Sequence, residues 1–213
     1  MKIEVFDRSG VLLRTLPRPG VSSDDFDLDV ADEPLVGNGD GNPDTVFALD
    51  RADDTVLASV SIGNDQTVGL SYNPADGLLY SLDWDSDLVR TFDPVTGAAV
   101  GSFPVQPVGA PGFTIFYGDL NVDADGNLQL VTDTFELTRV LTTSGEFVQD
   151  FDLSLLLGDG DLDLTGIAFD NDRGEAWVAS RGGLVYQLAG FPIPEPTSLA
   201  GLGLLGLALR RRR

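Results

Sequence analysis

Carboxylates are the side chains of this sequence that could do chemistry, and they gather in short, closely spaced runs. The stretch GDGDLDL places Asp159, Asp161 and Asp163 at alternate positions. Hard oxygen donors this close together suit Ca²⁺, and without a cation or water between them they repel one another. A solvated acidic loop explains the same stretch and is the favoured alternative, with calcium at these three residues as the hypothesis to test.

Two further runs carry oxygen donors in a similar pattern. GNGDGNPD supplies Asn38, Asp40, Asn42 and Asp44, and calcium is physically reasonable there as well. NVDADG, which begins at Asn121, reproduces the first half of a calcium-binding EF-hand loop, but Thr132 stands where the bidentate Glu is needed. We therefore expect NVDADG to be an Asx-rich turn.

The chain contains no cysteine and no histidine. This absence excludes disulfides, thiol nucleophiles, Cys/His zinc sites, Ser-His-Asp triads and imidazole acid–base chemistry. A pair of carboxylates for glycoside hydrolysis stays open, but no pair is singled out. We expect Trp84 and Trp177, in the second strands of their units, to fill the core rather than to form a sugar platform.

The charge balance limits the class of partner. The chain has 34 Asp and Glu against 13 Lys and Arg, which gives a formal net charge of −21. Such a surface repels phosphate backbones, so nucleic acid is excluded as a partner.

An internal repeat indicates which elements position these residues. Two glycines eight residues apart bracket GLSYNPADG, GDLNVDADG and GIAFDNDRG, which begin at Gly69, Gly118 and Gly166. Each copy is a strand that enters a turn and is followed by a second apolar run, which predicts a hairpin.

A second strand–turn–strand landmark follows each hairpin. It begins at Phe6, Leu49, Phe92, Leu141 and Tyr186, in steps of 43, 43, 49 and 45 residues. Four short strands per unit of this length predict an all-β fold, a β-propeller of four-stranded blades. The phrases GIAFD, VDADGNL and FDPVTGAAV resemble bacterial propellers with NHL-like or YVTN-like repeats.

About four blades are present, and the two ends contribute incomplete ones. Residues 3–16 supply the last two strands of a unit, and residues 166–188 supply the first three. The ends could complete one shared blade, or the chain could be a truncated larger propeller, which we favour because no secretion signal precedes Met1.

The C-terminus has a different composition. Thirteen small or apolar residues from Thr197 are followed by Arg210, Arg211, Arg212 and Arg213. We expect a short hydrophobic helix of roughly 20 Å, marginal for a bilayer core, whose arginines stay in the cytoplasm and place the acidic body across the membrane.

Pro194, Glu195 and Pro196, the apolar run and the basic end together resemble a PEP-CTERM sorting signal. The resemblance implies export in a Gram-negative bacterium and anchoring in the inner membrane through the C-terminal helix. It further implies processing by an exosortase-type enzyme and delivery to the cell surface or an exopolysaccharide matrix.

We therefore expect a repeat domain over residues 1–190 and a sorting signal over residues 191–213. The predicted function is a noncatalytic surface or matrix interaction protein, with exopolysaccharide as a candidate partner. Two alternatives stay open: a secreted Asp-dependent, calcium-assisted polysaccharide lyase or glycosidase, and a gene remnant that folds poorly.

Overall fold

The structure is a computed structural model of the whole chain. It describes residues 2–17, 28–30, 35–39, 44–50, 55–63, 67–123, 125–154, 163–170 and 175–189. The elements in these ranges are seventeen β-strands. The predicted C-terminal helix and all seven sorting-signal residues, from Pro194 to Arg213, lie outside the described residues.

The strands form five antiparallel sheets, each built from strands that are consecutive in the chain. The first sheet contains β1 (Lys2–Phe6) and β2 (Leu12–Pro17). The second contains β3 (Leu28–Val30), β4 (Leu35–Gly39), β5 (Thr45–Leu49) and β6 (Val56–Ser61). The third contains β7 (Thr67–Asn73), β8 (Leu78–Asp83), β9 (Leu88–Phe92) and β10 (Ala99–Pro104). The fourth contains β11 (Gly118–Val122), β12 (Asn127–Thr132), β13 (Phe135–Thr142) and β14 (Phe147–Asp152). The fifth contains β15 (Leu164–Asp170), β16 (Glu175–Ser180) and β17 (Val185–Ala189).

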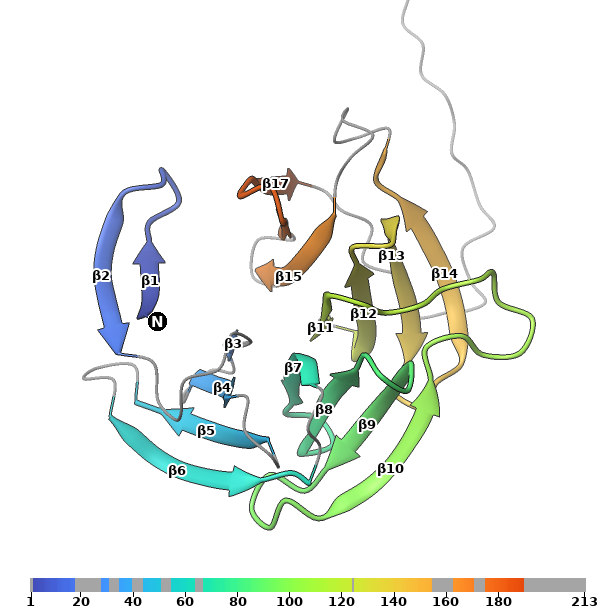
Figure 1. Cartoon of the computed structure of the whole chain (residues 1–213), viewed down its shortest axis with the longest axis horizontal. Helices are drawn as coiled ribbons and strands as arrows, with labels where there is room; N and C mark the ends of the chain where they lie inside the picture. The colour runs from blue at the N-terminus through green and yellow to red at the C-terminus, as the bar shows by residue number, and fades with distance from the viewer. Residues whose placement is uncertain are drawn as a thin grey trace, which may run out of the picture.

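These sheets follow one another around a common centre (Figure 1). In each four-stranded sheet the first strand lies nearest the centre and the fourth at the circumference, and β7 contacts β11, which contacts β15. This is the radial arrangement of propeller blades. The predicted β-propeller of four-stranded blades is confirmed.

The two ends of the described chain form separate sheets, with no strand pairing between them among the described residues. They are joined instead by Arg8, in the β1–β2 turn. Its guanidinium pairs with Asp170 and with Glu175, whose Oε2 lies 2.7 Å from Arg8 Nη1, and sits 5.9 Å from the centre of the Trp177 ring. The shared blade that the strand count allowed is therefore not the arrangement observed.

The two glycines of the predicted hairpin repeat have different structural causes. Gly77 and Gly126, at the second position, have φ of 74° and 77°, a left-handed conformation that a turn requires and that other residues rarely adopt. Gly69 and Gly118, at the first position, lie on the crowded inner strands. A Cβ at Gly69 would come 2.7 Å from the Leu120 amide nitrogen of the next blade.

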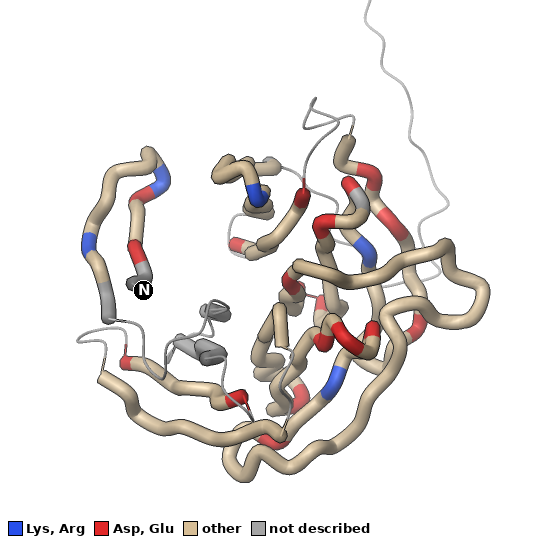
Figure 2. Tube along the Cα trace, in the orientation of Figure 1, with Lys and Arg blue, Asp and Glu red and all other residues tan. Residues whose placement is uncertain are grey.

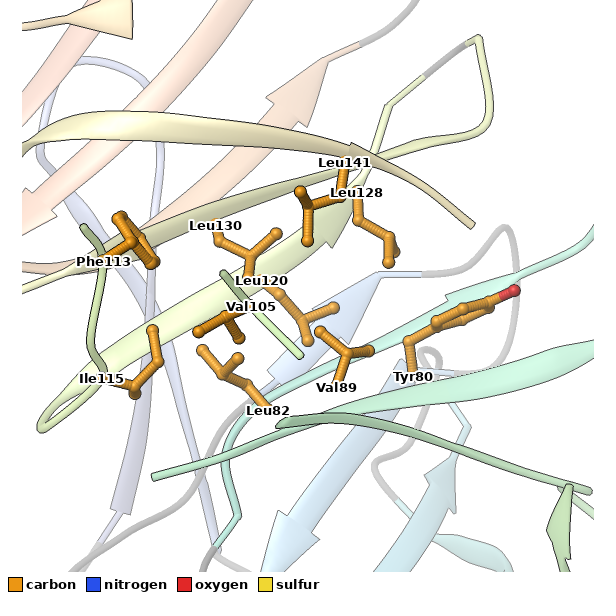
Figure 3. Close-up of a cluster of buried hydrophobic side chains, with 10 residues drawn as sticks. All are labelled: Tyr80, Leu82, Val89, Val105, Phe113, Ile115, Leu120, Leu128, Leu130 and Leu141. Atoms are coloured by element: carbon orange, nitrogen blue, oxygen red, sulfur yellow. The ribbon is translucent and has the colours of Figure 1, made fainter. Parts of the chain in front are cut away.

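The core lies between neighbouring blades rather than inside one sheet. The largest buried cluster joins the third and fourth sheets and includes side chains from the β10–β11 connection (Figure 3). Because a blade is covered on both faces, β8 and β12 are buried at almost every position, whereas the outer strands β6 and β10 are largely exposed. Burial of a single leucine contributes about 1.5–3 kcal/mol, so these interfaces hold the blades in place.

Candidate functional site

Three aromatic side chains and an arginine, drawn from three successive blades, meet on one face of the ring. On this face the connections that lead into the inner strands lie beside the turns between second and third strands. The Trp84 and Phe116 rings meet edge to face, with centroids 5.5 Å apart, and Phe116 meets Tyr117 in the same way at 4.9 Å. The Arg181 guanidinium lies over the Tyr117 ring, 4.6 Å from its centre. We call these four residues the aromatic row. Phe116 is 52% exposed, so the middle of the aromatic row faces solvent.

The β10–β11 connection, residues 105–117, carries the middle of the aromatic row and crosses in front of the fourth sheet (Figure 1). Asp87 fixes both of its ends: the Val105 N–H donates to the Asp87 carbonyl at 3.0 Å, and the Ile115 N–H donates to its carboxylate at 2.6 Å. Asp87 has φ of 52°, an uncommon conformation for a residue other than glycine. Such strain persists only where the surroundings enforce it.

Arg139 binds the β10–β11 connection from its buried side. Its side chain is fully buried and makes a two-point pair with the Asp150 carboxylate, with nitrogen–oxygen distances of 2.9 and 2.8 Å. Nη1 and Nη2 also donate to the carbonyls of Val105 and Pro111, and the centre of the Phe113 ring lies 4.4 Å from the Arg139 Cζ. The connection is therefore fastened by charged hydrogen bonds and does not depend on apolar packing alone.

Polar groups stand at one end of the aromatic row. The Tyr117 N–H donates to the Asp133 carboxylate at 3.1 Å, and Arg181 Nη1 lies 3.8 Å from the other oxygen of that carboxylate. The backbone N–H of Arg181 donates to the carbonyl of Asp163 at 2.8 Å. The Arg181 side chain is 56% exposed. The aromatic row thus ends in an exposed cation that can donate hydrogen bonds outward, beside a carboxylate whose side chain is only 10% exposed.

Acidic positions are spread over the blades, and the described basic positions are few and separated (Figure 2). Together with the net charge of −21, this surface disfavours anionic ligands at any face.

The structure places only part of each predicted oxygen cluster. Asp163 directly precedes β15, whereas Asp159 and Asp161 lie outside the described residues, so calcium at these three residues stays a prediction. Asp40 and Asn42 also lie outside them, but the buried Asp44 carboxylate accepts the Thr67 N–H of the next blade at 3.1 Å. In the part of the chain that the structure describes, no group of three or more acidic residues could hold a metal ion.

The NVDADG motif forms the predicted turn. The Asp123 carboxylate accepts the backbone N–H groups of Asp125 and Asn127 and the side-chain amide of Gln129, at 2.9–3.0 Å. Burial raises the pKa of Asp123 above the ordinary aspartate value, and the Gln129 hydrogen bond opposes that rise. Both carboxylate oxygens of Asp123 therefore stabilise the turn by accepting hydrogen bonds.

The aromatic row was only partly visible in the sequence. Trp84 packs against the core as expected, but it lies in the turn after β8 rather than in that strand, and it also meets Phe116. Phe116, Tyr117, Asp133 and Arg181 were not singled out. The aromatic density of FTIFYG within a connection was the available signal.

Comparison with known proteins accounts for the C-terminus. Residues 192–213 match the PEP-CTERM protein-sorting motif. The chain is a β-propeller with a PEP-CTERM sorting motif. The motif implies an exported protein that is anchored in the membrane before exosortase processing. Among the described residues, no helix has the length and apolar character needed to cross a bilayer.

Solved structures similar to this propeller are distant in sequence. A glutaminyl cyclase of Myxococcus xanthus aligns with a TM-score of 0.66 and 15% identity, over 84% of this chain and 76% of that chain. A luciferin-regenerating enzyme aligns with a TM-score of 0.58 and 18% identity, over 89% of this chain and 71% of that chain. Virginiamycin B lyase of Staphylococcus aureus aligns with a TM-score of 0.51 and 12% identity, over 91% of this chain and 64% of that chain. No curated protein matches the sequence. These similarities show the fold alone, and because all three are named as enzymes, the fold does not decide between catalysis and binding.

Proposed function

We propose that this PEP-CTERM propeller is a noncatalytic interaction module that acts at the cell surface or in the extracellular matrix. The proposal rests on the presence of two features in one chain. A sorting motif occupies residues 192–213, and the propeller before it carries an aromatic row that faces solvent. The motif accounts for delivery, and the aromatic row accounts for contact with a partner.

The chemistry of the chain supports binding over catalysis. Without cysteine or histidine, an enzyme of this sequence would depend for proton transfer on its carboxylates, its four tyrosines or its single lysine, none of which has an ordinary pKa near neutral pH. The carboxylate at the Arg181 end of the aromatic row, Asp133, already accepts the Tyr117 N–H, lies beside Arg181 and is 10% exposed. Such a carboxylate holds the site together and is poorly placed for acid–base work on a ligand.

The test of delivery uses the sorting motif itself. Replacing Pro194, Glu195 and Pro196 together by alanine in the native host should leave the protein in the membrane fraction and reduce its release to the surface or matrix. The matched control is Pro104→Ala, on the exposed outer strand β10, which should be processed normally. Equal release of the triple variant and the control would refute the proposed route.

The test of catalysis is separate. The full chain, incubated with matrix polysaccharides of the host, should produce no new reducing ends and no unsaturated uronates. Fragment release that is lost on changing one pair of aspartates to asparagines would replace the proposal with the lyase or glycosidase alternative.

A further inference from the structure

We infer that the aromatic row, Trp84, Phe116, Tyr117 and Arg181, is a binding site for an uncharged polysaccharide chain. This inference deepens the proposed function and rests on it for its biological setting, because delivery by the sorting motif would bring the site to such polymers. The binding chemistry itself can be measured on the isolated protein.

Phe116 is the ring that faces solvent, whereas Trp84 beside it packs against the core. Its edge-to-face contacts with Trp84 and Tyr117, at centroid distances of 5.5 and 4.9 Å, fix the orientation of Phe116 before any ligand arrives. A hexose ring presents an apolar face of C–H groups that can lie on such a surface. Because the ring positions are fixed, binding costs little side-chain entropy.

The polar end of the aromatic row supplies what sugar hydroxyls need. Arg181 has several N–H donors in a plane, is more than half exposed, and lies over Tyr117, so its outward donors border the apolar surface. The Asp133 side chain at the same end is only 10% exposed and accepts the Tyr117 N–H, so it holds this end of the site in place. A sugar hydroxyl can accept the outward hydrogen bonds of Arg181.

The backbone that carries the rings is preorganised. Asp87 fixes residues 105 and 115, and Arg139 binds the carbonyls of residues 105 and 111 from the buried side. Sites held by hydrogen bonds of this kind lose less freedom on binding than sites on unsupported loops. Ordinary surface loops do not require a buried arginine.

Charge and size select the class of ligand. The net charge of −21 repels polyuronates and sulfated polymers, and Arg181 in the aromatic row disfavours a polycation at this position. A stable protein partner would need about 800 Å² of this surface, whereas the aromatic row offers one ring that is more than half exposed. One half-exposed ring beside the Arg181 donors matches one or two sugar units of a chain.

The experiment is affinity gel electrophoresis of the full chain, in a mild non-ionic detergent, through gels that each contain one uncharged polymer. The panel is hydroxyethyl cellulose, laminarin, galactomannan and dextran, with alginate as the anionic comparison. Retardation is expected in at least one uncharged gel and not in alginate. It should not change between about 0.05 and 0.5 M NaCl, because stacking is not screened by salt.

Variants then locate the site. Phe116→Ala should weaken retardation about tenfold or more, and Phe116→Trp should restore it, because a flat ring is needed there. The matched control is Val108→Ala, in the same connection, where the valine is fully exposed and should not contribute. Thermal unfolding of each variant checks that the fold is unchanged.

Two results would overturn the inference: no retardation by any uncharged polymer, or equal retardation of Phe116→Ala and Val108→Ala. Neither result bears on release through the sorting motif. Conversely, normal retardation together with unchanged release of the Pro194–Pro196 variant would leave the site intact and refute the proposed route.

Discussion

Replacement of Arg139 by methionine gives the sharpest test of how the site is held. Methionine keeps much of the volume but removes the charge and all five donors. The loss includes two hydrogen bonds to Asp150 at 2.9 and 2.8 Å and the bonds to the carbonyls of Val105 and Pro111 at 3.3 and 3.0 Å. Arg139 is fully buried, and the Asp150 side chain is 17% exposed, so water can only partly replace the lost partner.

Breaking a buried pair in this way costs about 3–5 kcal/mol. For a chain of this size each kcal/mol lowers the melting temperature by about 2–4 °C, so a fall of roughly 6–20 °C is expected. The assay is thermal and urea unfolding followed by circular dichroism. The matched control is Arg181→Met: that arginine is 56% exposed and 3.8 Å from Asp133, so the change should cost less than about 1 kcal/mol.

The same variant should also loosen the connection. Amide hydrogen exchange across residues 105–117 should accelerate, and retardation by an uncharged polymer should weaken even at temperatures where the protein stays folded. Equal stability losses for Arg139→Met and Arg181→Met would refute the argument that the buried guanidinium fastens the aromatic row.

Three further predictions concern the blades. Gly118→Ala should destabilise by about 1–3 kcal/mol in urea unfolding, because its Cβ would lie 2.3 Å from the Val131 carbonyl oxygen, whereas Gly112→Ala, with open space around it, should be close to neutral; equal effects would contradict this. Arg8→Gln should cost less than about 1 kcal/mol at low salt and nothing at high salt, since its ion pairs are exposed; an effect independent of salt would count against an ionic link between the end sheets. Hydrogen bonds from the N–H groups of residues 96 and 95 and from the residue 96 hydroxyl lower the pKa of Asp93 below 3.8, so its contribution is present above that pH and is lost as the pH falls through the lowered value. The stability difference between wild type and Asp93→Ala should therefore shrink as the pH falls below 3.8, and a difference that stays constant with pH would refute the assignment.

The strands and turns followed from local chemistry. Gly77 and Gly126 mark turns that need a left-handed residue, and the aspartates beside them bind the turn amides. Because these interactions lie within a few residues, the hairpins and the four-strand unit could be predicted, and with them the propeller.

The inner glycines illustrate the limit of that reasoning. Gly69 and Gly118 repeat in the sequence like the turn glycines, but their cause is the approach of backbone atoms across or within blades near the ring centre. The separate end sheets joined by Arg8 likewise depend on where distant strands come to lie.

The sequence by itself determined the blade pattern, the sorting motif and the absence of thiol and imidazole chemistry, because each depends on neighbouring residues or on composition. Only the tertiary structure decided the candidate site. Trp84, Phe116 and Arg181 come from three blades, and the buried Arg139 from β13 holds the connection between them. A propeller brings the turns of successive blades to one face, so residues far apart in the chain become neighbours there, and no local pattern records which of them will meet.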